Sequence, residues 1–175
     1  MKTFFSKFSV IALFAIVAVS ACKDDDDDKG GMKACQNGAF TANINGQSTS
    51  ATSFNNTLLK GNSGGSAGKR MDIRATDGSG RQLIITISDL SSGSSGDGVS
   101  TDPYIPFDDI TTGTENSFMF TIIQNNVSYT YIDGALDVTS CDASSKQVSG
   151  TFSFSDEDFQ VTNGTFTNMC YTILQ

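Results

Sequence analysis

The sequence contains no histidine, and this absence excludes several kinds of active site. Nucleophiles that work in Ser-His or Cys-His pairs need an imidazole as their general base. Zinc sites with imidazole ligands are excluded as well, and a site built from cysteine alone needs four thiolates. Only four cysteines are present, and one of them, Cys22, belongs to an export motif described below. We therefore expect neither a zinc site nor a cofactor.

Basic residues are also scarce in this chain. It has 11 Lys and Arg against 19 Asp and Glu, which gives a formal net charge of -8 at pH 7. Proteins that bind nucleic acid present a basic patch, or a basic stripe with interleaved aromatic residues, and the sequence has neither. The charge of the protein does not favour an anionic membrane surface either. We expect no nucleic-acid partner.

A run of apolar residues long enough to cross a membrane is missing too. The apolar stretch FSVIALFAIVAV covers only residues 8–19, whereas a spanning helix needs about 20 such residues. It follows Lys2 and Lys7 with no acidic residue between them, as in an export signal. The stretch ends in VSAC at residues 19–22.

This VSAC segment, a branched apolar residue followed by two small residues and a cysteine, resembles the bacterial lipobox. The resemblance implies that residues 1–21 are a lipoprotein signal peptide and that Cys22 becomes the first mature residue, with acyl chains such as palmitate attached. One acyl chain gives only marginal binding at about 0.8 kcal/mol per buried methylene, so the three chains of a lipoprotein are needed for lasting attachment to a membrane. The plain alternative is a secretory signal followed by an ordinary thiol.

The residues directly after Cys22 admit more than one interpretation. They are Lys23, Asp24, Asp25, Asp26, Asp27 and Asp28. They resemble an affinity tag, but they follow an intact export signal, and five consecutive acids cannot converge on one calcium ion. A solvated spacer within a flexible tether over residues 22–37 is the plain interpretation. The run also resembles the lysine-plus-acid export signal of surface lipoproteins in Bacteroidota, which implies an outer-membrane location facing the cell exterior.

The rest of the chain, residues 38–175, favours β-structure throughout. Apolar residues recur with period two, and no window favours a long helix. Four dipeptides typical of hairpin turns separate these runs: Asn45-Gly46, Asp77-Gly78, Asp133-Gly134 and Asn163-Gly164. We predict a single all-β domain, an antiparallel meander of about eight to ten strands that closes into an up-and-down, calycin-like barrel, with a β-sandwich as the alternative. A change of phase predicts a bulge near Thr167 and Asn168.

Four short motifs carry a family resemblance. They are FTANING at 40–46, GALDVTS at 134–140, VSGTFSF at 148–154 and TNGTFTN at 162–168. Together they resemble a family of small Bacteroidota outer-membrane lipoproteins of uncharacterised function. Because these motifs consist of strand residues and turn glycines, the resemblance implies a fold and a location and transfers no catalytic residue. Members usually carry a large aromatic residue shortly after the first turn, and residues 47–50 have none.

Three cysteines remain once Cys22 is acylated, namely Cys35, Cys141 and Cys170. In an oxidising compartment this number suggests one disulfide and one odd cysteine. The favoured pair is Cys141–Cys170, because both are out of phase with their apolar neighbours and so could share a sheet face. A strand lying between them would separate them by nearly twice the strand spacing of about 4.8 Å, which is beyond disulfide reach.

The long loop at residues 91–109 is a candidate functional rim. Its apolar tip includes Tyr104 and Phe107, which could plug one end of a barrel or contact a ligand or partner. Its aspartates match no calcium-loop spacing, so we expect no metal site there. The acids at residues 156–158 lie on a turn instead of facing each other across a cleft, which does not suit glycoside hydrolysis. We therefore expect no enzymatic activity.

The function expected from these features is that of a lipid-anchored, surface-exposed outer-membrane lipoprotein. Its β-barrel would be a non-catalytic binding or accessory module for a glycan, a small molecule or an outer-membrane protein. The alternative is a structural envelope lipoprotein without its own ligand, and an enzyme is a third, weaker interpretation. A cavity inside the barrel, lined for example by Tyr129 and Tyr131, would favour the binding module. The 13 phenylalanines could instead fill the interior, which would favour the structural lipoprotein.

Overall fold

The structure is a computed structural model that describes residues 38–63, 66–90, 96–111 and 115–174. By its contacts the chain divides into two units, Met1–Gly31 and Met32–Gln175, and every described residue lies in the second. The expected signal peptide, the lipidated Cys22, the acidic run and Cys35 all lie outside the described residues. Their roles remain predictions.

The described part of the chain is almost entirely β-structure. Its strands are β1 (Ala39–Ile44), β2 (Gln47–Phe54), β3 (Thr57–Ser63), β4 (Ser66–Asp77), β5 (Gln82–Asp89), β6 (Ile105–Pro106), β7 (Ser117–Gln124), β8 (Val127–Tyr131), β9 (Ala135–Asp142), β10 (Gln147–Ser155), β11 (Gln160–Cys170) and β12 (Thr172–Leu174). A single turn of 3-10 helix, η1 (Phe107–Asp109), follows β6. Among the described residues, no helix has the length and apolar character needed to cross a membrane.

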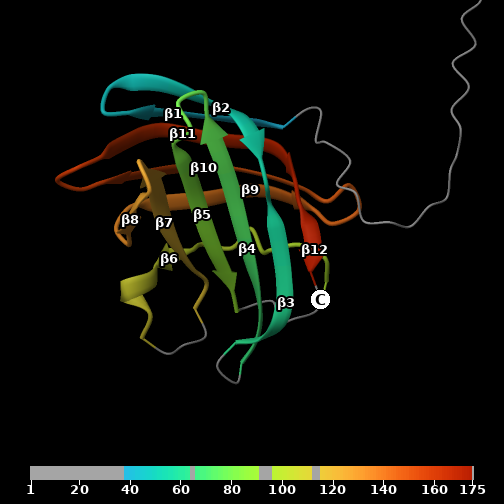
Figure 1. The fold of residues 1–175 in the computed structure, drawn as a ribbon. Coiled ribbons are helices and arrows are strands. Elements are labelled where there is room, and N and C mark those ends of the chain that lie inside the picture. Colours follow the sequence, from blue (N-terminus) through green and yellow to red (C-terminus); the bar gives the residue numbers. More distant parts are fainter. Residues whose placement is uncertain (1–37, 64–65, 91–95, 112–114, 175) are drawn as a thin grey trace, which may run out of the picture. The chain divides into compact units, whose positions relative to one another are not determined.

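These strands form one mostly antiparallel sheet that is nearly closed into a barrel (Figure 1). Within this sheet β1 pairs with β2 on one side and with β11 on the other. From β1 the ladder runs through β2, β4 and β5 to β7, and from β11 it runs through β10 to β9. Successive long strands alternate in direction, as in a meander of hairpins. The predicted up-and-down barrel is confirmed.

One seam of the barrel is incomplete, and it lies where β8 leads into β9. β8 pairs with β7 and β9 pairs with β10, yet both run in the same direction along the barrel. Asp133-Gly134 therefore does not form the predicted hairpin turn. Instead the chain kinks there and continues in one direction, changing its partner from β7 to β10. Gly134 has a φ of +139° and lies so close to the carbonyl oxygen of Ser153 that a Cβ atom would clash with it.

A second irregularity joins the strands that follow the two neighbours of β1, because β3 follows β2 and β12 follows β11. β3 and β12 pair with each other in parallel. Their pairing lies beyond Ala39, which is the first residue of β1. Asn56 stabilises this junction, since its side chain donates to the carbonyl of Cys170 at 2.9 Å and accepts from the backbone amide of Arg74 at 2.9 Å. This buried amide thereby links β4 to the end of β11.

The turn and bulge residues confirm some sequence predictions and correct others. Asn45 and Gly46 both have positive φ and form the predicted tight turn between β1 and β2. Asn163-Gly164 does not form a turn: it lies within β11, where the register with β1 and β10 shifts and Asn163 has a φ of 51°. The predicted bulge near Thr167 and Asn168 is confirmed by a second register shift in β11.

The barrel interior is packed with aromatic side chains. The largest of the fully buried residues are Phe118, Phe120 and Phe166, and the ring of Phe120 stacks on that of Phe154 with centroids 4.5 Å apart. Two further rings, Phe40 and Phe152, join this cluster. Such close packing leaves little free volume inside, so the interior described here resembles a protein core more than a ligand chamber.

Candidate functional site at the barrel mouth

Four tight turns meet at one end of the barrel, which we call the mouth. They connect β1 to β2, β4 to β5, β7 to β8 and β10 to β11. A pocket of about 390 Å³ opens here, and it takes residues from all four connections. Its lining consists of Ile44, Asn45, Gln47, Arg81, Gln124, Asn125, Val127, Tyr129, Asp158 and Phe159.

The strand register explains why these side chains point into the mouth. Residues directly opposite each other in an antiparallel pair lie on the same face of the sheet. Gln47 is opposite the buried Ile44, and Tyr129 is opposite the buried Ile122. The inward-facing rows therefore continue past the apolar core and end in partly exposed, mostly polar residues.

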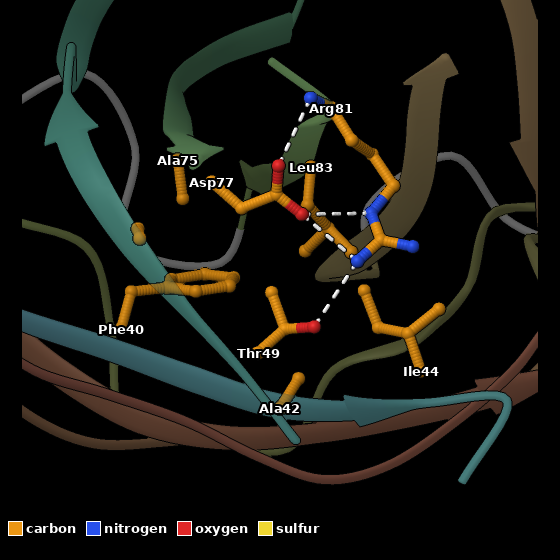
Figure 2. A pocket seen from close by; sticks show the side chains of 9 residues that line it. Phe40, Ala42, Ile44, Thr49, Ala75, Asp77, Arg81 and Leu83 are labelled. Atoms are coloured by element: carbon orange, nitrogen blue, oxygen red, sulfur yellow. Dashed lines mark hydrogen bonds and ion pairs between the residues drawn. The ribbon is translucent and has the colours of Figure 1, made fainter. Parts of the chain in front are cut away.

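Arg81 forms the floor of the mouth pocket. Its Nη2 lies 2.8 Å from Oδ2 of Asp77, and the same nitrogen donates to Oγ1 of Thr49 at 3.1 Å (Figure 2). Nε of Arg81 donates to Oδ2 of Asp77 at 3.0 Å. All of its hydrogen bonds to described residues leave Nη1 unused, so this nitrogen can donate to a ligand.

Below Arg81 the barrel interior is nearly full. The small pocket on that side holds about 10 Å³, room for roughly one water molecule, and it is lined mainly by apolar residues such as Phe40, Ala42 and Leu83 (Figure 2). Ile44 and Arg81 line both this pocket and the mouth. They thus divide the filled interior from the open pocket, and a ligand at the mouth would rest on Arg81 instead of entering the barrel.

Asp77 holds the turn that carries Arg81. Its Oδ1 accepts hydrogen bonds from the backbone amides of Ser79 at 2.9 Å and Arg81 at 3.1 Å, and from the Ser79 hydroxyl at 2.6 Å. Burial raises the pKa of Asp77, whereas these hydrogen bonds and the charge of Arg81 lower it. The lowering effects are together the larger, so the pKa falls below its ordinary value of 3.8. The Asp77–Arg81 pair is therefore fully charged at neutral pH.

Asn45 fixes the opposite wall of the mouth. Its Nδ2 donates to the carbonyl of Asp158 at 3.2 Å, and its Oδ1 accepts from the amide of Gln160 at 2.7 Å. Within the same loop, Oδ1 of Asp156 accepts from the amides of Asp158 and Phe159, each at 2.8 Å. These contacts link the β1–β2 turn to the β10–β11 hairpin, which makes the wall rigid before any ligand arrives.

An aromatic wall completes the pocket. Tyr129 and Phe159 meet edge to face with ring centroids 5.3 Å apart, and Phe159 also contacts the ring of Tyr131. Burial, and then the nearby charges of Asp156 and Asp158, raise the pKa of Tyr131 well above its usual range. Its hydroxyl is buried and has no hydrogen-bond partner among the described residues. Tyr131 thus belongs to the core, whereas the half-buried Tyr129 lines the pocket.

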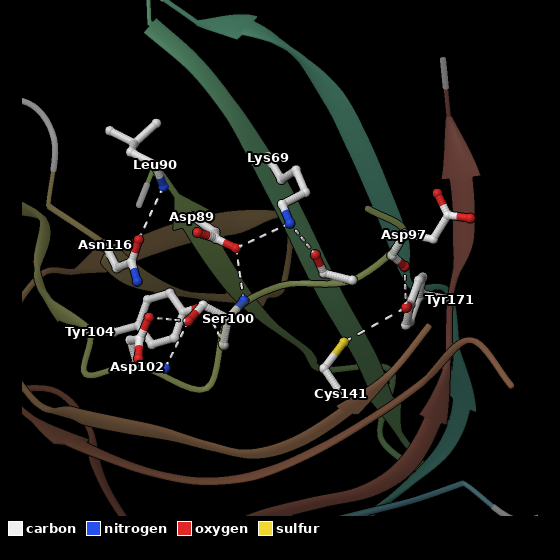
Figure 3. Close-up of polar contacts among 11 residues, drawn as sticks. Lys69, Asp89, Leu90, Asp97, Ser100, Asp102, Tyr104, Asn116, Cys141 and Tyr171 are labelled. Atoms are coloured by element: carbon white, nitrogen blue, oxygen red, sulfur yellow. Dashed lines mark hydrogen bonds and ion pairs between the residues drawn. The ribbon is translucent and has the colours of Figure 1, made fainter. Parts of the chain in front are cut away.

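The opposite end of the barrel is closed by part of the long loop. Tyr104 is buried there, and its hydroxyl donates to the carbonyl of Ser100 at 2.8 Å (Figure 3). Phe107, by contrast, lies exposed on η1. The structure therefore does not bring the two proposed rim residues together at an open site. Tyr104 has the plugging role that the sequence left open.

A buried ion pair that was not predicted from the sequence holds this plug. Nζ of Lys69 lies 3.5 Å from Oδ2 of Asp89, and both side chains are at least nine-tenths buried (Figure 3). Nζ of Lys69 also donates to the carbonyl of Gly98, and the amide of Ser100 donates to Oδ2 of Asp89 at 2.7 Å. The sequence could have revealed this pair, because both charged residues occupy inward-facing positions of the period-two pattern. Lys69 precedes the buried Met71 by two residues, and Asp89 follows the buried Ile87 by two.

The predicted disulfide between Cys141 and Cys170 is wrong, because Cys141 is a free cysteine. These residues lie on β9 and β11, with β10 between them, and this arrangement places them too far apart to bond. Cys170 is disulfide-bonded, and its partner lies outside the described residues. Sγ of Cys141 lies 3.7 Å from the hydroxyl of Tyr171 (Figure 3).

The acidic residues noted in the sequence are not arranged for catalysis. Asp97 is paired with Lys60, which lowers the pKa of the carboxyl group. The acids at 156–158 are exposed on the β10–β11 hairpin. Among the residues that can be described, no group of three or more Cys, Asp or Glu side chains is placed to hold a metal ion.

Comparison of the chain with protein-family models, curated proteins and solved structures gives no match. A function for the chain therefore has to be argued from the mouth pocket and from the sequence of the N-terminal segment.

Proposed function

We propose that this protein is a lipid-anchored, surface-exposed outer-membrane lipoprotein whose barrel is a non-catalytic binding module. One observation carries the binding role: a pocket of about 390 Å³ with rigid polar walls lies above a filled interior. Small-molecule sites usually have volumes of about 300–1,000 Å³ and often lie in the mouths of β-barrels. The ligand would bind at the mouth and leave the core undisturbed.

A second candidate is a structural envelope lipoprotein with no ligand. The filled interior favours it, because a barrel that carries a ligand inside needs an internal cavity. The mouth favours a binding role over this candidate. Asn45, Asp77 and Asp156 each use their side chains to fix a turn of the wall, and such preorganisation lowers the entropic cost of binding.

The anchoring part of the proposal depends on Cys22 and the acidic run. It is tested by metabolic labelling with palmitate, which should label the wild-type chain and leave Cys22→Ala unlabelled. Surface display is tested by adding protease to intact cells. We expect the wild type to be cleaved and a variant with Asp24–Asp28 changed to alanine to be protected. Cleavage of both would show that the aspartates are only a spacer, and protection of both would place the domain in the periplasm.

The binding part can be tested with a single fluorescent reporter, because the chain contains no tryptophan. Val127 lines the mouth and is 48% exposed, while Leu59 on β3 is 47% exposed and does not line it. We would compare Val127→Trp with Leu59→Trp against sugars, amino acids, short peptides and nucleosides. At least one compound should change the emission of the first variant only. If no compound does so, the binding role is wrong.

A further inference from the structure

The chemical groups at the mouth narrow the class of ligand. Six of the ten lining residues carry a planar polar group: the amides of Asn45, Gln47, Gln124 and Asn125, the guanidinium of Arg81 and the carboxylate of Asp158. Amides offer both donors and acceptors, while a guanidinium only donates and an ionised carboxylate only accepts. A ligand matched to this set must itself donate and accept hydrogen bonds at several neighbouring points. Adjacent hydroxyl groups on a sugar ring do this.

The charges at the mouth disfavour an anionic ligand. Asp77 already neutralises Arg81, with 2.8 Å between Nη2 and Oδ2. Asp158 adds a negative charge that no ion pair among the described residues neutralises. Asp156 and Glu157 lie on the same hairpin. A phosphate, a uronic acid or a free carboxylate would therefore meet repulsion and would find only Nη1 of Arg81 as a cationic donor. A neutral ligand avoids this cost.

The remaining lining residues provide an apolar surface of a suitable kind. The edge-to-face pair of Tyr129 and Phe159 lies beside Val127, which is 48% exposed. Large exposed apolar side chains lose contact with water when an apolar surface covers them. The C–H face of a pyranose ring is such a surface, and its hydroxyl edge would then face the amides.

From these observations we infer that the mouth binds the end of a neutral saccharide. The inference rests on the proposed binding role of the mouth and names the ligand for it. The planar groups of Gln47, Gln124 and Arg81 would hydrogen-bond the hydroxyls, and Tyr129 would cover one ring face. Because the floor at Arg81 is closed and the volume lies near the lower end for ligand sites, the pocket accepts a chain end and leaves the rest of the saccharide outside.

The test uses the full acylated chain in a detergent without a sugar headgroup. Binding is detected by saturation-transfer NMR and measured by calorimetry. The probes are neutral saccharides (glucose, galactose, mannose, xylose, N-acetylglucosamine and their short oligomers), the charged galacturonate and glucuronate, inorganic phosphate and short neutral peptides. We expect at least one neutral saccharide to bind. The charged sugars and phosphate should bind at least tenfold more weakly, because an anion at the mouth would be repelled by the like charge of Asp158.

Four substitutions in the pocket and one control outside it locate the site. Gln47→Ala and Gln124→Ala should each weaken binding by about threefold to tenfold, the value of one or two hydrogen bonds. Tyr129→Ala should weaken it by about tenfold, while Tyr129→Phe keeps the ring and the affinity. Gln82→Ala is the matched control, because this exposed glutamine begins β5 but lies outside the pocket, and it should bind as the wild type does.

Three results would overturn the inference. If charged sugars, phosphate or peptides bind at the mouth and neutral saccharides do not, the ligand class is wrong while the proposed binding role stands. If a neutral saccharide binds but Gln47→Ala, Gln124→Ala and Tyr129→Ala keep full affinity, the saccharide site lies elsewhere. Should none of these probes bind, the saccharide inference fails, and the Val127→Trp reporter then decides whether the mouth binds any other class of molecule.

Discussion

Arg81 and Asp77 are joined by an ion pair of 2.8 Å that separates the filled interior of the barrel from its open mouth. The pair serves two purposes. It neutralises a guanidinium that faces inward, and it fixes the turn between β4 and β5 through the amides that bind Asp77. The floor of the pocket is therefore both charged and rigid.

This arrangement predicts a pH-dependent contribution to stability. The pKa of folded Asp77 lies below its ordinary value of 3.8, so its stabilising effect is complete above that value and is lost as the pH falls through the lower, folded pKa. Asp77→Asn should be about 1–3 kcal/mol less stable than the wild type at pH 7. In urea unfolding followed by circular dichroism, this difference should shrink as the pH falls below 3.8. A difference that stays constant down to pH 2 would contradict the role of the carboxylate.

The buried pair of Lys69 and Asp89 predicts strong coupling. Lys69→Met leaves Asp89 charged and buried, which costs about 3–5 kcal/mol, whereas replacing both partners by apolar residues is often nearly neutral. We expect the double variant Lys69→Met/Asp89→Leu to be more stable than Lys69→Met alone. Urea unfolding of the wild type, both single variants and the double variant measures this coupling. Additive effects of the two substitutions would show that the two charges do not interact.

Replacing tyrosine by phenylalanine should affect stability differently at the two buried tyrosines, Tyr131 and Tyr104. The Tyr131 hydroxyl is buried without a partner among the described residues, whereas the Tyr104 hydroxyl donates to Ser100 at 2.8 Å. Tyr131→Phe removes an unsatisfied group and should leave stability unchanged or raise it. Tyr104→Phe removes a hydrogen bond and should lower stability by about 1 kcal/mol. Thermal unfolding of the two variants side by side provides the comparison, and equal losses would be inconsistent with it.

The cysteines predict a labelling pattern. Without reduction, iodoacetamide should modify Cys141, which is free and half-buried, and leave Cys170 unmodified because it is disulfide-bonded. After reduction both should react. Mass spectrometry of the peptides measures the pattern and identifies the residue bonded to Cys170. Cys141→Ser is the control and should keep the disulfide, while modification of Cys170 before reduction would rule the bond out.

The sequence allows the fold to be predicted better than the site. Period-two alternation, the turn at Asn45-Gly46 and the bulge near Asn168 all follow from local preferences and were confirmed. Asp133-Gly134 and Asn163-Gly164 have the same local preference for positive φ, but the chain uses them for a kink and a bulge. A dipeptide favours a backbone conformation, and its neighbours in space decide whether that conformation reverses the chain.

The mouth itself could not be predicted from spacing. Gln47, Arg81 and Gln124 were not singled out in the sequence, although each lies next to a tight turn at the end of an inward-facing row. Tyr129 was named only as a possible lining of an internal cavity. The rim proposed for Tyr104 and Phe107 was placed on the longest loop, and the structure buries Tyr104 there with the help of Lys69 and Asp89. Loop length indicates where a chain is irregular and does not show whether the loop is packed.

The sequence by itself determined the alternation of inward and outward residues, the antiparallel pairing of strands joined by tight turns and the absence of histidine chemistry, because these depend on residue type and on near neighbours along the chain. The tertiary structure decided what meets at each end of the barrel. Barrel closure places Asn45 against Asp158 and Gln160, more than a hundred residues away, and inserts β10 between Cys141 and Cys170. Contacts of that kind follow from strand register around the whole barrel, which no local segment encodes.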